Sequence, residues 1–178
     1  KIDQLTFGIR KPGYSTKELS ICGVDENENI KCVENTYPAR YNNRTPVARI
    51  IVNGVPDATG FLFGSDGYFL TAYHFLETSQ PPQLDFEWLY ESDFCPGFCD
   101  EGVIEDVDYT MIKYVDNSTL DYALLRLHDS NGSSSSLDKY GYLQTRNYDI
   151  LEKEPIYIIH HPLGHCKQIA YTSDQAAD

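Results

Sequence analysis

Residues 58–74 read Ala58-Thr59-Gly60-Phe61-Leu62-Phe63-Gly64-Ser65-Asp66-Gly67-Tyr68-Phe69-Leu70-Thr71-Ala72-Tyr73-His74, and the rest of the chain is organised around them. Two short apolar runs flank the turn formers Gly64-Ser65-Asp66-Gly67, which is typical of a β-hairpin. His74 stands just past the second run. Because a histidine held at the end of a rigid strand can act as a base, the stretch predicts both a sheet and a candidate catalytic residue.

The composition is that of an acidic globular protein. The 178 residues are 41% hydrophobic, enough for one domain or two small ones with a real core. With 27 acidic and 14 basic residues the net charge is −13, which argues against binding to nucleic acid or an anionic membrane, because phosphate groups attract positive charge. No run approaches the roughly 20 apolar residues of a membrane span. Lys1-Ile2-Asp3-Gln4 is no signal peptide, so a leader is expected to have been removed or not included.

Cysteines and glycosylation sequons point to the secretory route. The five cysteines lack the paired spacing of a zinc ribbon, so disulfides are the better interpretation, and the odd count leaves at least one without an internal partner. They are Cys22, Cys32, Cys95, Cys99 and Cys166. Three sequons, at Asn43, Asn117 and Asn131, fall in polar, turn-like sequence that could carry a glycan. We therefore expect a secreted protein.

Most of the remaining chain predicts short strands separated by turns. Residues 1–46 are rich in turn formers and predict an irregular arm held by disulfides. Strands are expected at residues 47–52, 84–90, 111–115, 123–127, 156–160 and 167–172. In the strand 84–90, alternation places Leu84, Phe86, Trp88 and Tyr90 on one buried face. Residues 131–136 predict a flexible linker, and no convincing helix is found, which indicates an all-β sandwich or barrel.

Asp121 is the candidate partner of His74. A histidine is an effective general base when its other ring nitrogen donates to a buried carboxylate. Asp121 immediately precedes the apolar run Tyr122-Ala123-Leu124-Leu125-Arg126-Leu127 and lies 47 residues after His74. The histidine after the hairpin, the aspartate before a strand, their order and their separation together resemble the trypsin-like serine peptidases.

The resemblance narrows to secreted peptidases related to the bacterial lysyl endopeptidases. It is carried by Cys22, Cys32, the run from Phe86 to Cys95 and the segment Ile158-Ile159-His160-His161-Pro162, and it covers most of residues 20–174. It implies an all-β, two-barrel trypsin-like fold: arm 1–46, complete first barrel 47–128, Ser-rich linker 129–139, and opening strands of an incomplete second barrel at 140–178. It also implies a Cys32–Cys95 disulfide, leaves Cys166 open, and leaves Cys22 for a partner beyond residue 178.

The chain departs from this family in two places. Ala58 and Phe75 occupy the positions of a usual disulfide, so an apolar contact is expected to replace a bond that contributes about 2–4 kcal/mol. The second departure is that no Gly-x-Ser-Gly nucleophile motif occurs: Ser65 lies in the hairpin turn, and residues 133–136 lack the flanking glycines of an oxyanion hole. The nucleophilic serine is therefore expected beyond this chain.

The resemblance implies a serine endopeptidase acting on a protein or peptide substrate. His74 would be the general base and then the acid to the leaving amine, and Asp121 its orienting carboxylate, while a second chain or C-terminal fragment carries the serine. Alone, the chain is expected to be inactive. A truncated sequence, an internal cleavage and a loss of catalysis remain open. The alternative function is that of an inactive, peptidase-like secreted binding module. The specificity pocket would lie in the missing half, so no lysine preference is inferred.

Three further interpretations are rejected. Residues 49–54 resemble a zymogen cleavage site, but they lie too close to Gly60 and predict an ordinary strand. His160, His161, His165 and Cys166 resemble a zinc site, but adjacent strand residues point to opposite faces, so one of the two neighbouring histidines is expected to be buried and no metal or cofactor is expected. No cysteine has the glycine-rich context of a cysteine-peptidase nucleophile.

Overall fold

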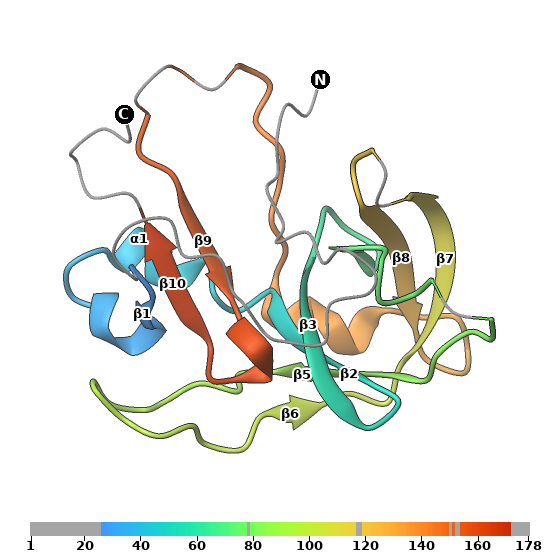
Figure 1. The fold of residues 1–178 in the computed structure, drawn as a ribbon, viewed down its shortest axis with the longest axis horizontal. Coiled ribbons are helices and arrows are strands. Elements are labelled where there is room, and N and C mark those ends of the chain that lie inside the picture. The colour runs from blue at the N-terminus through green and yellow to red at the C-terminus, as the bar shows by residue number, and fades with distance from the viewer. Residues whose placement is uncertain (1–25, 78, 117–118, 150, 152–153, 172–178) are drawn as a thin grey trace.

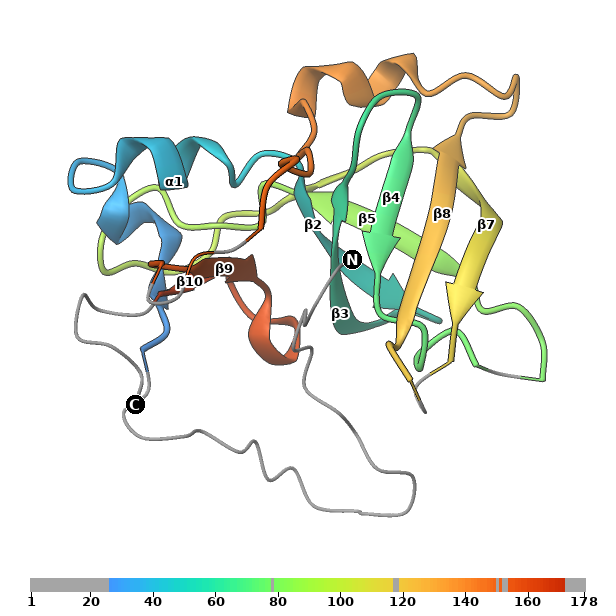
Figure 2. The same ribbon diagram turned by 90° about the horizontal axis from the view of Figure 1, so that it is seen from above.

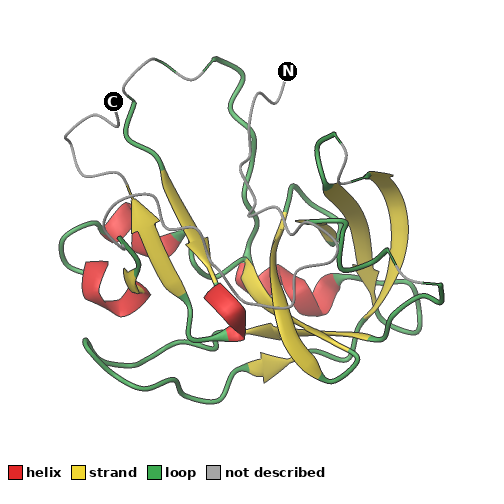
Figure 3. Cartoon of the chain, viewed as in Figure 1, coloured by secondary structure: helices red, strands yellow, loops and turns green. Residues whose placement is uncertain are grey.

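Two antiparallel sheets make up most of the structure, with only short helices (Figures 1 and 3). The computed structural model describes residues 26–77, 79–116, 119–149, 151 and 154–171. Over these residues, the larger sheet has seven strands in the order β6-β5-β2-β3-β4-β8-β7, and the smaller has three in the order β1-β10-β9. The predicted all-β class is confirmed.

Short strands, with a few short helical segments between them, follow one another along the described chain. The strands are β1 (Glu28–Asn29), β2 (Val47–Val52), β3 (Val55–Leu62), β4 (Tyr68–Thr71), β5 (Leu84–Trp88), β6 (Val103–Ile104), β7 (Asp108–Val115), β8 (Tyr122–His128), β9 (Tyr157–His160) and β10 (Gln168–Tyr171). The helical segments are η1 (Ile30–Val33), α1 (Pro38–Asn42), η2 (Ser135–Tyr140) and η3 (Pro162–Gly164). The smaller sheet and α1 lie at one end of the molecule, and β7 and β8 lie at the other (Figures 1 and 2).

The predicted hairpin forms from β3 and β4, and its turn has the backbone that its residues favour. Asp66 and Gly67 have φ values of 65° and 73°, in the left-handed region that Asp and Gly tolerate best. On β3, a Cβ atom at Gly60 would collide with the ring of Phe69 on β4. Glycine at this position therefore leaves room for the buried ring of Phe69 to pack against β3.

The larger core lies against the seven-stranded sheet. Every second residue of β8, from Ala123 to Leu127, is fully buried, as strand alternation requires. Phe69 meets Phe86 and Trp88 edge to face, with ring centroids 5.1 and 6.4 Å apart. Trp88 is a core residue, as the strand pattern predicts.

The strand pattern fails one residue beyond β5. Leu89 has a φ of 59°, so the strand ends at Trp88 and the predicted continuation of the buried face to Tyr90 is wrong. The ring of Tyr90 instead lies 3.4 Å from the guanidinium of Arg49 on β2. A left-handed residue reverses the alternation, and a leucine gives no local signal for that conformation.

The end of the predicted flexible linker is helical in the structure. Ser135–Tyr140 forms η2, and its residues Leu137 and Tyr140 are only 2% and 4% exposed. Tyr140 stacks on Trp88 at 4.8 Å and its hydroxyl donates to Glu105 Oε1 at 2.6 Å. The serine-rich composition hides two apolar residues three positions apart, a spacing that puts both on one side of a 3₁₀-helix.

A second, smaller core joins the arm to the smaller sheet. It contains Ile30, Val33, Tyr41, Val47, Ile159 and Ile169. The arm was predicted to be irregular, but from residue 26 onward it contains β1, which pairs with β10, and the short helix α1. Proline at the first position of α1 and its buried Tyr41 explain a helix too short for a periodic signal.

Two disulfides connect the sheets. Cys32 bonds Cys95, as the family resemblance implies, with Cα atoms 5.0 Å apart. Cys166, left open by the sequence, bonds Cys99, with Cα atoms 5.6 Å apart. Cys22, the Asn117 sequon and residue 172 of the last predicted strand lie outside the described residues. The division into two barrels at 47–128 and 140–178 stays a prediction.

Candidate active site

His74 lies in the turn that follows β4, near the middle of the larger sheet. Thr71, the last residue of β4, is fully buried and its hydroxyl donates to the Thr59 carbonyl at 2.8 Å. The Leu76 amide donates to the Tyr73 carbonyl at 2.8 Å and closes the turn around His74. The neighbouring strand and this turn therefore hold the backbone of the histidine.

Asp121 lies at the start of β8, the strand that pairs with β4. Thr71 on β4 stands opposite Ala123 on β8. Because these strands are antiparallel, the residue after β4 and the residue before β8 lie at the same end of the sheet. Asp121 has a φ of 46°, and its amide donates to the Asp116 carbonyl at 3.0 Å.

The two side chains are in direct contact. His74 Nδ1 lies 2.7 Å from Asp121 Oδ2, and Asp121 Oδ1 accepts from the amides of Tyr73 and His74 at 3.0 and 2.9 Å. The aspartate side chain is 11% exposed and the imidazole 28%. The structure thus brings together the two predicted residues, while their catalytic role stays a prediction.

This arrangement can exchange a proton at one defined atom. An ionised carboxylate only accepts hydrogen bonds, so Nδ1 carries the proton and donates it to Asp121. The remaining nitrogen, Nε2, is then the one that can take up a proton, and the carboxylate stabilises the imidazolium that results. The partly exposed ring and the mostly buried carboxylate suit general-base chemistry.

Ala58 and Phe75, where the resemblance led us to expect apolar packing in place of a disulfide, both lie at the core. Phe75 is 8% exposed and is part of the larger apolar cluster, against which Ala58 packs. The Phe75 and His74 rings meet at a right angle, with centroids 6.0 Å apart. Ala58 and Phe75 thus both pack on one apolar core, and the Phe75 ring also buttresses the imidazole.

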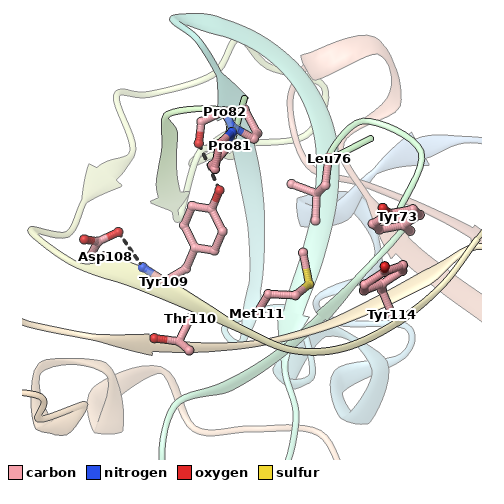
Figure 4. A pocket seen from close by; sticks show the side chains of 9 residues that line it. All are labelled: Tyr73, Leu76, Pro81, Pro82, Asp108, Tyr109, Thr110, Met111 and Tyr114. Carbon is pink, nitrogen blue, oxygen red and sulfur yellow. Dashed lines mark hydrogen bonds between the residues drawn. The ribbon is translucent and has the colours of Figure 1, made fainter. Parts of the chain in front are cut away.

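A cavity of about 580 Å³, with Tyr73, the chain neighbour of His74, in its wall, was not foreseen from the sequence (Figure 4). Its walls come from Tyr73, Leu76, Pro81, Pro82, Asp108, Tyr109, Thr110, Met111 and Tyr114. Tyr73 stacks on Tyr114 at 4.4 Å, and the Tyr109 hydroxyl donates to the Pro82 carbonyl at 3.0 Å. Burial raises the pKa of Tyr109, which keeps this hydroxyl a neutral donor.

A β-bulge explains why the sequence did not reveal the cavity. The pairing of β7 with β8 shifts between Met111 and Lys113. Plain alternation would continue the face of Tyr109 and Met111 at Lys113, whereas the bulge brings Tyr114 to that face instead (Figure 4). The extra residue at a bulge has no local sequence signal.

The serines that have a glycine close by in the sequence lie away from His74 and Asp121. Ser65 occupies the turn that precedes β4, at the opposite end of this strand from His74, and its hydroxyl donates to Asp66 at 2.8 Å. Residues 133–135 and this hairpin turn together line a second hollow. The structure therefore brings none of these serines to His74.

His160 and His161 face different surroundings, as expected of strand neighbours. His160 Nε2 lies 2.7 Å from Asn27 Oδ1, whereas His161 is buried and its Nδ1 lies 3.0 Å from the His165 carbonyl. Burial lowers the pKa of His161 to about 3, so it is neutral at pH 7. Cys166 is disulfide-bonded, and the described residues contain no cluster of three or more His, Cys, Asp or Glu able to hold a metal ion.

Two comparisons with known proteins bear on this site. A family model described as "Lysyl endopeptidase, C-terminal domain" matches residues 23–178. Secreted RxLR effector protein 73 of Plasmopara viticola is 30% identical over 163 residues, covering 86% of this chain. The chain spans 39% of that relative's length.

Two observations support secretion of the protein. The relative is a secreted protein, and both disulfides in the structure are bonds typical of an oxidising compartment. The predicted secretory location is thereby confirmed. Across the part of the chain that the structure describes, no helix has the length and apolar character to cross a membrane.

Proposed function

The chain belongs to the family of the lysyl endopeptidase C-terminal domain, and from this premise we propose that it supplies the histidine and aspartate of a secreted serine endopeptidase. The observation that carries the proposal is the 2.7 Å contact between His74 Nδ1 and Asp121 Oδ2. A carboxylate held by two backbone amides and aimed at one ring nitrogen is the arrangement that general-base catalysis needs.

In this proposal His74 moves the proton twice. Nε2 accepts the hydroxyl proton of the attacking serine and later gives it to the leaving amine of the cleaved peptide. Asp121 keeps Nδ1 protonated and stabilises the imidazolium between these steps. The substrate is a protein or peptide. A lysine preference would depend on residues outside this chain.

The nucleophile is assigned to polypeptide outside residues 1–178. No Gly-x-Ser-Gly motif occurs in these residues, and the described glycine-flanked serines lie at the far end of β4 from His74. A later part of the same protein or a second chain would carry the serine. Because the histidine and aspartate act as a unit with the nucleophile, residues 1–178 alone are proposed to be inactive.

A second candidate function is a peptidase-like binding module without catalysis. One observation favours it: the relative's description as a secreted effector. In such a module the contact between His74 and Asp121 would only stabilise the fold.

A labelling experiment tests the first proposal against the second. The intact secreted protein that contains this chain is treated with a fluorophosphonate, and its peptidase activity is measured in parallel. We expect a labelled serine outside residues 1–178, with activity reduced roughly a million-fold by His74→Ala and about ten-thousand-fold by Asp121→Asn.

Asp66→Asn is the matched control, because it removes an exposed carboxylate from the hairpin turn at the other end of β4. It should leave activity unchanged. If the intact protein neither labels nor cleaves peptides, the binding-module function replaces the peptidase.

A further inference from the structure

The loop between β5 and β6 exposes large aromatic side chains to solvent. We name residues Ser92–Gly102 the aromatic loop. Its Phe98 is 89% exposed and its Phe94 is 58% exposed. Large side chains of this kind are normally buried, so a pair of them on one short loop is unusual for a surface without a partner.

The backbone of the aromatic loop is held at several points. Cys95 is bonded to Cys32 of η1, and Cys99 to Cys166 just before β10. The Asp100 amide donates to the Glu91 carbonyl at 3.0 Å, which closes the base of the loop. The two phenylalanines are thus presented on a backbone whose conformation is covalently restrained.

Local contacts also keep Phe94 in place. The buried Ser92 hydroxyl donates to the Phe94 carbonyl at 2.7 Å and accepts from its amide at 3.3 Å. The Phe94 ring lies so close to Gly97 that a side chain at this glycine would displace it. The loop therefore has an internal structure that supports exposed rings instead of folding over them.

The charge of the aromatic loop is of one sign. Asp93, Asp100 and Glu101 are exposed on it, and residues 92–102 contain no lysine or arginine. Two copies of the loop would bring like charges together in a protein of net charge −13, and an anionic lipid surface would repel it as well. A partner with basic residues around an apolar pocket would complement both features.

We propose that the aromatic loop is a docking site for another protein, with Phe98 seated in an apolar pocket whose rim carries lysine or arginine. A buried aromatic anchor surrounded by weaker polar contacts is the usual composition of an interface hot spot. The disulfides reduce the conformational entropy that ordering the loop would cost on binding. The loop lies at the end of the molecule that holds the smaller sheet, away from β7 and β8, so docking leaves the proposed catalytic pair accessible (Figures 1 and 2).

The test uses a phage-displayed library of random linear peptides as the probe. Peptides are selected on the intact secreted protein after removal of those that bind its Phe94→Ser/Phe98→Ser variant. We expect the retained peptides to combine apolar residues with lysine or arginine. Their affinity should fall about tenfold or more for Phe98→Ser, and about threefold for the variant Asp93→Asn/Asp100→Asn/Glu101→Gln.

The matched control is Val55→Ser, which removes an exposed apolar side chain, 62% exposed, at the start of β3. It should leave affinity unchanged, and every variant is first checked for both disulfides by mass spectrometry and for native circular dichroism. The proposal is overturned if no peptide survives the subtraction or if the retained peptides lack basic residues. It is also overturned if the parent protein self-associates in sedimentation, or binds phosphatidylcholine vesicles, and the Phe94→Ser/Phe98→Ser variant does not.

Discussion

The His74–Asp121 pair and the junction between the two sheets both bring ionisable side chains into close contact, but their cationic partners are buried to different degrees. The junction is the cluster of Arg44, Arg49, Glu87, Glu91 and Lys167. At the pair, the imidazole is 28% exposed. At the junction, the Lys167 side chain is fully buried, and its Nζ donates to the Arg44 carbonyl at 3.0 Å and lies 3.2 Å from Glu91 Oε2. The partly exposed imidazole can exchange protons with solvent, whereas the buried Lys167 and its partners hold the two sheets together.

The junction contains two further ion pairs, Arg49–Glu87 and Arg44–Glu91. Arg49 Nε donates to Glu87 at 2.7 Å, and its Nη1 donates to the Gly164 carbonyl of η3 at 2.7 Å. Arg44 Nε donates to Glu91 at 2.7 Å. Asp121 and Glu91 are almost equally buried, at 11% and 12% exposed, so the two sites differ in the group that faces the carboxylate: a partly exposed imidazole at the pair and a fully buried ammonium at the junction.

The largest effect should come from Glu91→Gln at the junction. The change removes the negative partner of Lys167 and Arg44 and leaves a cation buried without compensation, at an expected cost of about 3–5 kcal/mol in the free energy of unfolding. Urea denaturation at pH 7 measures it. Glu34→Gln is the control, because Glu34 pairs with Lys31 on the surface with 39% of its side chain exposed and should cost under about 1 kcal/mol. Equal costs for the two variants would show that burial does not separate them.

A smaller effect should come from the buried imidazole of His161. Burial lowers its pKa to about 3 in the folded protein, against an ordinary histidine pKa of 6.5, so the unfolded chain binds the proton more readily. The stability that the neutral His161 contributes is therefore fully present well above pH 6.5 and is lost as the pH falls toward 3, by about 1.6 kcal/mol between pH 6.5 and pH 5.

Urea denaturation at both pH values tests this sign and size. His161→Phe should flatten the pH dependence. His165→Asn, which removes an exposed imidazole, should leave it as in the parent protein. An unchanged slope in His161→Phe would mean that another group causes the acid sensitivity.

The smallest effect should come from Asp121→Asn, the same carboxylate-to-amide change at the candidate catalytic pair. The amide oxygen can still accept from the Tyr73 and His74 amides, and His74 remains partly hydrated, so the expected loss of stability is about 1 kcal/mol. Urea denaturation of Asp121→Asn in parallel with Glu91→Gln measures the difference in stability loss between the two sites. A loss as large as that of Glu91→Gln would assign Asp121 a structural role as important as the junction's.

Elements with local signals were predicted well. The hairpin around Gly64-Ser65-Asp66-Gly67 and the strand Val47–Val52 match the structure, because turn formers and β-branched residues act over a few neighbouring positions. Prediction failed at Tyr90, in η2 and in α1. A left-handed leucine, two apolar residues within a serine-rich run, and a five-residue helix are each decided by packing with distant parts of the chain.

The sequence by itself determined the all-β class, the order of His74 and Asp121 along the chain, and the cysteines available for disulfides. Only the tertiary structure decided that Cys166 pairs with Cys99, that Lys167 is buried against Glu91, and that a bulge turns Tyr114 toward Tyr73. The reason is physical: propensity and alternation depend on near neighbours, whereas burial, ion pairing and cysteine pairing depend on residues that only the folded chain brings together.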